Sequence, residues 1–255
     1  MDTDNNIRNQ IIILDNENRD ILKEYTDIEL AASFSKNKKN YEILEKLLLK
    51  ENNKSDMLTE VLILIIKYKE KTSSVDAIKL LIKYGADVNR EFNYRKLPFS
   101  EKRSILINCC LYPISSVELI ELLIESGADV NSKIETRTPL MHFIRNCSKV
   151  EDLQIIKLLI RNHSQVNYKD IYGLTSLMVC FELRYNMLIR YDIIKILLDN
   201  KADIYIKNNN NENILNIVEK AIGKNSDIYS LIFNYVEYKN NHLCEFDINF
   251  IYNYL

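Results

Sequence analysis

A twelve-residue pattern occurs four times in this chain of 255 residues, and it constrains the fold more than any other feature. Each copy begins with Ile, continues with apolar residues at helical spacing and ends in a short polar turn. The copies are Ile78–Asn89, Ile120–Asn131, Ile156–Asn167 and Ile194–Tyr205, and their last residues lie 42, 36 and 38 positions apart. Self-similarity at a nearly fixed period predicts stacked repeats, in which each repeat buries an apolar face against its neighbours.

The periodicity within each copy predicts an amphipathic helix that is closed by a left-handed turn. Gly85 and Gly127 stand just past two of these helices, where glycine adopts a positive φ at little cost. His163 and Lys201 stand at the same place in the other two copies, so we expect those turns to be strained, by about 1 kcal/mol each, or rearranged. In the helix of the second copy, the predicted apolar stripe consists of Val117, Ile120, Leu123 and Ile124.

A second motif lies upstream of each copy and indicates the start of a preceding helix. It is clearest at Thr138–Met141, where a threonine N-cap precedes a proline at the first helical position. A weaker form is found at Thr175–Met178, and the weakest forms are at Thr59–Leu62, Ser104–Ile107 and Asn213–Asn216. Together, this motif and the Leu-Leu helix followed by Gly-Ala-Asp-Val-Asn resemble the ankyrin repeat. The resemblance implies an all-α solenoid of helix-turn-helix units that binds proteins through a concave face and finger loops.

The repeat pattern also predicts how the chain is divided. We expect an ankyrin-repeat solenoid of about six units with degenerate terminal caps, because terminal repeats must close an open core. Residues 1–22 are predicted to be an N-terminal extension, residues 23–240 the repeat array and residues 241–255 a C-terminal capping helix. The predicted units are about 23–55, 56–91, 92–134, 135–170, 171–208 and 209–240. Long inter-helix loops, especially Phe181–Arg190, and a composition rich in Asn, Lys, Ile and Tyr resemble divergent ankyrin proteins, including those of poxviruses.

The residue content indicates no catalytic chemistry. The three histidines have no second His and no Cys pair at metal-ligand spacing, and four scattered glycines do not form a phosphate-binding loop. We therefore expect no enzymatic activity, no cofactor and no metal site. An odd number of cysteines, five, without a C-x-x-C pair argues against an oxidised secreted protein. The longest apolar run, Val61–Ile66, is far shorter than the roughly 20 residues of a membrane span. We predict a cytoplasmic monomer without membrane attachment, in the host cytosol if the protein is viral.

Recurring acidic and amide residues mark the polar turns of the copies. The bonding of such side chains to backbone amides within a turn explains their recurrence more simply than an acidic binding stripe does. We therefore expect a structural role for Asp87, Asp129 and Asp203, and likewise for Asn89, Asn131 and Asn167.

The resemblance places the binding surface on the fingers, which are the connections after each second helix. By position they are Arg90–Arg103, Ser132–Arg137, Tyr168–Tyr172 and Ile206–Glu212. The finger side chains expected to be exposed are those of Tyr94, Arg95, Lys133, Glu135, Arg137, Tyr168, Lys169, Tyr172 and Lys207. The predicted partner-binding residues are Phe92, Tyr94, Arg95, Lys133, Glu135, Arg137, Tyr168, Lys169, Tyr172 and Lys207.

Three functions remain open from the sequence. The first is a non-enzymatic scaffold that binds a protein partner. The second is an effector or ubiquitin-ligase adaptor, in which residues 241–255 recruit machinery as an F-box-like helix; this segment lacks the Leu-Pro start of such helices. The third is nucleic-acid binding by finger 90–103, which has a local charge of +3 and interleaved aromatic residues. The same aromatic residues are also consistent with binding of a protein or with packing within the loop. A net charge of −2 for the whole chain does not favour nucleic acid.

Overall fold

The computed structural model describes residues 45, 48, 55–67, 75–93, 102–111, 116–134, 136–182 and 187–241. These residues form ten α-helices, one short 3₁₀ helix, η2 (Val150–Asp152), and one two-stranded hairpin. The helices are α4 (Ser55–Lys67), α5 (Val75–Lys83), α6 (Ile105–Leu111), α7 (Val117–Glu125), α8 (Pro139–Asn146), α9 (Leu153–Arg161), α10 (Ser176–Val179), α11 (Met187–Asp199), α12 (Ile214–Ile222) and α13 (Asp227–Asn241).

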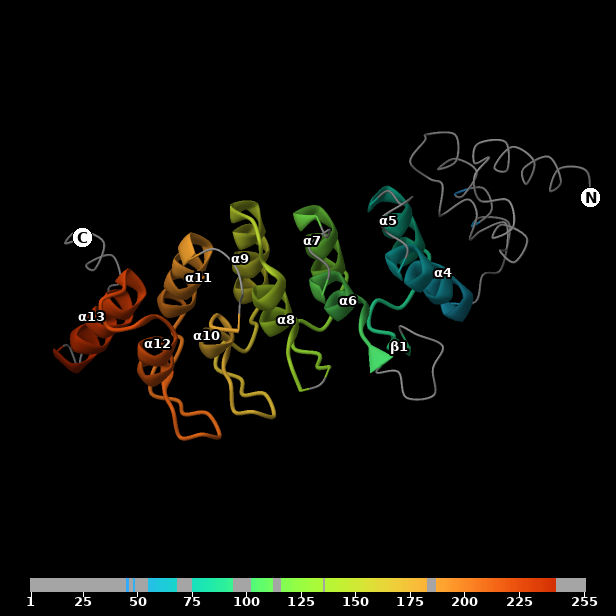
Figure 1. Cartoon of the computed structure of the whole chain (residues 1–255). Helices are drawn as coiled ribbons and strands as arrows, with labels where there is room; N and C mark the ends of the chain where they lie inside the picture. The colour runs from blue at the N-terminus through green and yellow to red at the C-terminus, as the bar shows by residue number, and fades with distance from the viewer. Residues whose placement is uncertain are drawn as a thin grey trace, which may run out of the picture. The chain divides into compact units, whose positions relative to one another are not determined.

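The described residues belong to two compact parts, of which the first ends at Asp129 and the second begins at Val130 and also includes Cys110 and Leu111. In the first part, α4 packs on α5 and α5 packs on α7. In the second part, the pairs are α8 with α9, α10 with α11, and α12 with α13 (Figure 1). First helices also pack on first helices (α8, α10, α12) and second helices on second helices (α9, α11, α13). This pattern is the repeat stacking that the sequence period predicts.

Burial in the second helices follows the repeated Leu-Leu signature. The second apolar residue of each pair is fully buried; these residues are Leu81, Leu123, Leu159 and Leu197. Truncation of such a leucine to alanine costs about 2–5 kcal/mol in a packed core. The stripe predicted for α7 is partly wrong, because Val117 is exposed whereas Leu119 is buried. Val117 is the first residue of the helix, and the N-cap Ser116 stands before it.

The turns after α9 and α11 keep the left-handed geometry of the glycine turns. His163 and Lys201 have φ values of 67° and 64°, in the same region as the 88° of Gly127. The amide of Ser164 donates to the carbonyl of Leu159 at 3.2 Å and so closes the last turn of α9. The substitution of glycine therefore produces strain rather than rearrangement.

Two helix starts differ from the sequence prediction. Helix α4 begins at Ser55, four residues before the predicted start at Thr59, and the Thr59 hydroxyl donates to the Ser55 carbonyl at 2.7 Å. Helix α11 begins at Met187, so the last part of the predicted loop Phe181–Arg190 is helical. The starts at Ser104 and Asn213 are confirmed, because each side chain accepts the backbone amide three residues later.

The finger that begins at Arg90 has a hairpin at its base. Strand β1 (Phe92–Asn93) pairs with the antiparallel strand β2 (Lys102–Arg103), with Phe92 opposite Arg103. Phe92 is buried, so this ring helps to hold the hairpin in place.

The described helices include none that is both long and apolar enough to cross a membrane. The predicted extension 1–22 and nearly all of the predicted cap 241–255 lie outside the described residues, as does most of the first predicted unit, 23–55.

Candidate partner-binding site

Asparagine side chains fix the bases of the first three fingers to the following repeat. The Asn131 amide nitrogen donates to the carbonyl of His163 at 3.1 Å, and its amide oxygen accepts the backbone N–H of Gln165 at 2.8 Å. We call this pair of bonds an asparagine bridge. The same bridge joins Asn89 to Gly127 and Asp129, and Asn167 to Lys201 and Asp203.

These bridges correct the expectation of purely local turn bonding. The asparagines bond residues 32 to 40 positions away along the chain, in the turn of the next repeat. Two of the aspartates behave as expected, because Asp87 and Asp203 each accept the backbone amide two residues ahead at 2.8 Å. The amides set the repeat spacing at the finger bases, and Asp87 and Asp203 shape their own turns.

Side chains of the second part also connect neighbouring fingers. The ammonium of Lys133 lies 4.4 Å from the ring centroid of Tyr168. The ammonium of Lys169 donates to the carbonyl of Lys207 at 2.8 Å. Each lysine therefore reaches from its own finger to the next one, and the fingers of this part form one connected surface.

Backbone contacts strengthen the connection between the last two fingers. Asn209 donates its backbone N–H to the carbonyl of Tyr172 at 3.0 Å and its side-chain amide to the carbonyl of Ile171 at 2.7 Å. Gly173 has a φ of 75°, and a Cβ at this position would lie 2.6 Å from the side-chain oxygen of Asn209. The absence of a side chain at Gly173 is thus what lets the two fingers approach so closely.

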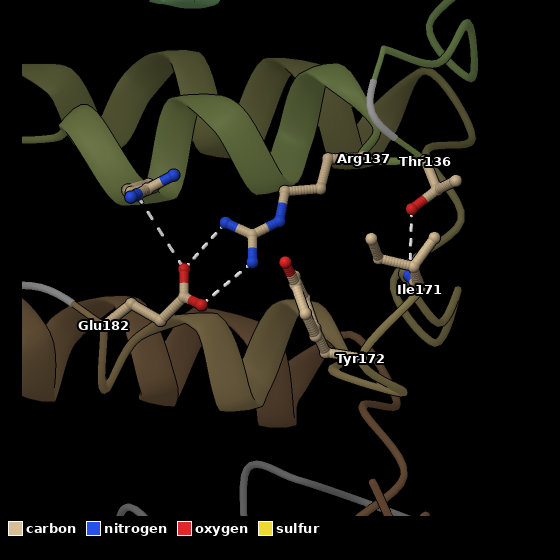
Figure 2. A pocket seen from close by; sticks show the side chains of 6 residues that line it. Thr136, Arg137, Ile171, Tyr172 and Glu182 are labelled. Atoms are coloured by element: carbon tan, nitrogen blue, oxygen red, sulfur yellow. Dashed lines mark hydrogen bonds and ion pairs between the residues drawn. The ribbon is translucent and has the colours of Figure 1, made fainter. Parts of the chain in front are cut away.

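A buried arginine joins the finger after α7 to the next repeat. Nε of Arg137 donates to Oδ2 of Asp170 at 2.9 Å, while Nη1 and Nη2 donate to the two carboxylate oxygens of Glu182 at 2.7 and 2.8 Å (Figure 2). The Asp170 carboxylate is fully buried, and Arg137 is only 7% exposed. The hydrogen bonds to Glu182, together with the charges of both carboxylates, raise the pKa of Arg137 above its usual value.

Asp170 is itself fixed by its own finger. Its Oδ1 accepts the backbone N–H groups of Tyr172 and Leu174, each at 2.9 Å. Oδ1 of Asp170 therefore stabilises the turn of its own finger. Oδ2 bonds Arg137 and so connects this finger to the preceding repeat. The expectation that Arg137 is exposed is wrong, since a bidentate pair with Glu182 and a bond to Asp170 occupy its guanidinium.

A pocket of about 660 Å³ opens beside this ion-pair network. Its polar wall contains Arg137, Glu182 and the exposed Arg145, whose Nε lies 3.8 Å from Oε2 of Glu182. Its apolar wall is the tip of the next finger, where Ile171 and Tyr172 are 55% and 61% exposed. Figure 2 shows the Tyr172 ring pointing from the finger toward the Arg137–Glu182 pair. The remaining lining residue is Thr136.

Hydrogen bonds from both sides hold the finger tip that forms the apolar wall of the pocket. Thr136, at a φ of 65°, accepts the backbone N–H of Ile171 at 2.8 Å on one side, and Asn209 holds the carbonyl of Ile171 on the other. Two large apolar side chains are therefore presented to solvent on a backbone that is bonded to both neighbouring fingers.

The predicted site residues are found in three situations. Tyr172 is exposed as expected, as are the lysines 133, 169 and 207, while Tyr168 is half-buried under Lys133. Phe92 and Arg137 are buried. Tyr94, Arg95 and Glu135 lie outside the described residues.

Sequence reasoning missed Ile171, Arg145 and Glu182. Ile171 belongs to a predicted finger, so its exposure could have been anticipated from its neighbour Tyr172, which was expected to be exposed. Arg145 and Glu182 follow no finger pattern, because they come from the end of α8 and from just after α10. Only the packing of these first helices brings them to the finger tips.

The described residues contain no candidate metal cluster, and their cysteines are buried. No group of three or more His, Cys, Asp or Glu side chains in this part of the chain could hold a metal ion. The four described cysteines are buried thiols. Burial raises the pKa of the Cys147 thiol to about 12 and that of Cys180 above its usual range, so both stay protonated at neutral pH.

A comparison with protein-family models decides the family. The model for ankyrin repeats, which describes three copies, matches residues 28–134 and 106–208, together more than half of the chain. The chain belongs to the ankyrin-repeat family. The predicted all-α ankyrin-repeat solenoid is confirmed, whereas the match gives no support for a poxvirus-like origin. A search of the curated proteins found no match.

Proposed function

We propose that this ankyrin-repeat protein is a non-enzymatic scaffold that binds a protein partner through the fingers of its second part. Ankyrin repeats are in general protein-interaction modules, which supports the scaffold role. The observation that carries the proposed location is the exposed pair Ile171 and Tyr172, which stands at a pocket and on a backbone bonded from both sides.

The physical argument is preorganisation. Binding energy at protein interfaces is concentrated in a few buried aromatic and arginine side chains, and a surface that is already ordered loses little conformational entropy on binding. Tyr172 and Arg145 supply these residue types at the pocket, and Ile171 adds apolar area. The fold orders all three, since two lie on a tied finger and one on α8.

Affinity capture followed by mass spectrometry tests this proposal. The bait is the full chain, compared with an Ile171→Ala/Tyr172→Ala variant. The matched control is Val150→Ala, which removes an apolar side chain that is 62% exposed in η2, outside the fingers. We expect a partner that wild type and the control retain and the double variant loses. Identical sets of captured proteins for all three chains would refute the proposed location.

The finer sequence predictions remain proposals with less support. An adaptor role depends on residues 241–255, of which only Asn241 is described. Nucleic-acid binding by finger 90–103 loses one of its three aromatic side chains, because Phe92 is buried. The cytoplasmic location and the monomeric state stay predictions from the sequence.

A further inference from the structure

Three lysines occupy equivalent positions on the fingers of the second part. Lys133, Lys169 and Lys207 each stand two residues after the last residue of a twelve-residue copy, at intervals of 36 and 38 residues. All three are exposed. We call these residues the lysine row.

The lysine row is ordered without being neutralised. Lys133 lies over the ring of Tyr168, and Lys169 donates to a backbone carbonyl on the next finger. Neither of these contacts cancels the positive charge. Within the described residues, no lysine of the row forms an ion pair.

The acidic groups near the row are occupied by other cations. Asp170 and Glu182 pair with Arg137, and Glu182 also lies close to Arg145. Glu212 pairs with Lys220, which lowers the pKa of that carboxyl.

The count of charges at this surface is positive. Counted from the sequence, the cations are Lys133, Arg137, Arg145, Lys169, Lys207 and Lys220, and the anions are Glu135, Asp170, Glu182 and Glu212, so six minus four leaves +2. The whole chain has a formal charge of −2, so the positive surplus is local to this surface.

The pocket adds an apolar element to the charged row. Ile171 and Tyr172 form its exposed wall, and Arg145 lies on the opposite wall. A partner that fits must therefore combine an apolar side chain for the pocket with negative charges for the lysines of the row.

We propose that the lysine row and the Ile171–Tyr172 pocket recognise an acidic peptide segment with a central aliphatic or aromatic residue. This inference rests on the proposed function and specifies the class of partner. The central residue packs against Ile171 and Tyr172, and flanking Asp or Glu side chains pair with the lysines. A single-stranded nucleic acid fits less well, because the Tyr168 ring is already covered by Lys133 and leaves Tyr172 as the exposed aromatic face of the pocket.

Selection from a random peptide library, displayed on phage and about twelve residues long, tests the proposal with the full chain as bait. We expect the enriched peptides to carry excess Asp and Glu around one Leu, Ile, Phe or Tyr. Enrichment of neutral or basic peptides, or no enrichment, would overturn the proposal.

One enriched peptide, fluorescently labelled, is then measured by anisotropy against a variant with all three lysines of the row changed to Gln. Loss of three solvent-exposed ion pairs predicts binding weaker by about tenfold. The matched control, Lys79→Gln/Lys83→Gln/Lys149→Gln, removes the same charge from exposed lysines outside the fingers and should change affinity less than about twofold. Equal losses in both variants, or tighter binding of an oligothymidine strand than of the peptide, would also overturn the proposal.

The two proposals can fail separately. The affinity capture described above separates them. If its partner is lost from the Ile171→Ala/Tyr172→Ala variant but bound normally by the lysine-row variant, the finger surface binds a protein and the acidic specificity is wrong. If both variants keep every partner, the proposed binding of a protein through these fingers is wrong.

Discussion

Replacement of Arg137 by methionine tests whether the buried ion-pair network holds the second part of the chain together. Methionine retains much of the volume and apolar character of the arginine side chain but removes its charge and all of its donors. The change leaves the Asp170 carboxylate fully buried and without its cation. Glu182 keeps only Arg145, at 3.8 Å.

The magnitude follows from what each carboxylate retains. Removal of one member of a buried ion pair costs about 3–5 kcal/mol, because the remaining charge stays desolvated. Asp170 still accepts two backbone N–H groups through Oδ1, and Glu182 is 29% exposed and gains water. These two compensations place the expected loss of unfolding free energy at the lower limit, about 3 kcal/mol.

Urea unfolding followed by circular dichroism at 222 nm measures this loss. The matched control is Arg145→Met, an exposed cation of the same network, for which we expect a change below about 0.5 kcal/mol. Hydrogen exchange at the amides of Tyr172 and Leu174 gives a local readout, because both amides bond to Asp170. Their protection should fall in the Arg137→Met variant and stay unchanged in the control.

A double-mutant cycle separates the ion pair from general packing. Asp170→Asn removes the uncompensated charge, so the double variant Arg137→Met/Asp170→Asn should be more stable than the sum of the two single changes predicts, by about 1 kcal/mol or more. Additive effects, or a loss below about 1 kcal/mol for Arg137→Met alone, would refute the reasoning that Arg137 compensates a buried charge.

Four further outcomes follow from the structure. Gly173→Ala should cost about 2–3 kcal/mol in urea unfolding, because the new Cβ meets Asn209, whereas Gly127→Ala, with a similar φ and open space in the turn after α7, should cost only about 1–2 kcal/mol; equal costs would contradict the close approach. Lys201→Gly should raise the free energy of unfolding by about 1 kcal/mol, because the residue has a φ of 64°, which glycine adopts with less strain than lysine. In a Cys244→Ser background, Cys147 should react with an aromatic disulfide at pH 8 only after unfolding, because burial raises its pKa to about 12. Burial also raises the pKa of Tyr235, so its stabilising contribution is complete below the unfolded value near pH 10 and is lost as the pH rises further; Tyr235→Phe should flatten that part of the stability curve.

The period of the sequence predicted the repeated helices and their core because both depend on local spacing. The Leu-Leu signature located the fully buried leucines, and glycine at two equivalent turns identified the left-handed geometry that His163 and Lys201 share. These features recur in every copy, so one copy supports the reading of the others.

The candidate site was less accessible to this reasoning. Arg137 belongs to a finger, and nothing near it in the sequence indicates that its partners lie 33 and 45 residues away. Phe92 looked like a binding aromatic until the hairpin with β2 buried it. Burial of finger residues depends on the neighbouring repeat, whose side chains a local pattern does not specify.

The asparagine bridges have a consequence for how this protein can change over evolution. Each bridge ends on backbone atoms of the next repeat, at Gly127 and Asp129, at His163 and Gln165, or at Lys201 and Asp203. The receiving side chains are therefore free to vary, and Gln165 already stands where the other two copies have aspartate. A repeat could be duplicated, exchanged or lost by recombination and still find a compatible neighbour, so new finger sequences could be acquired without a new way of joining them.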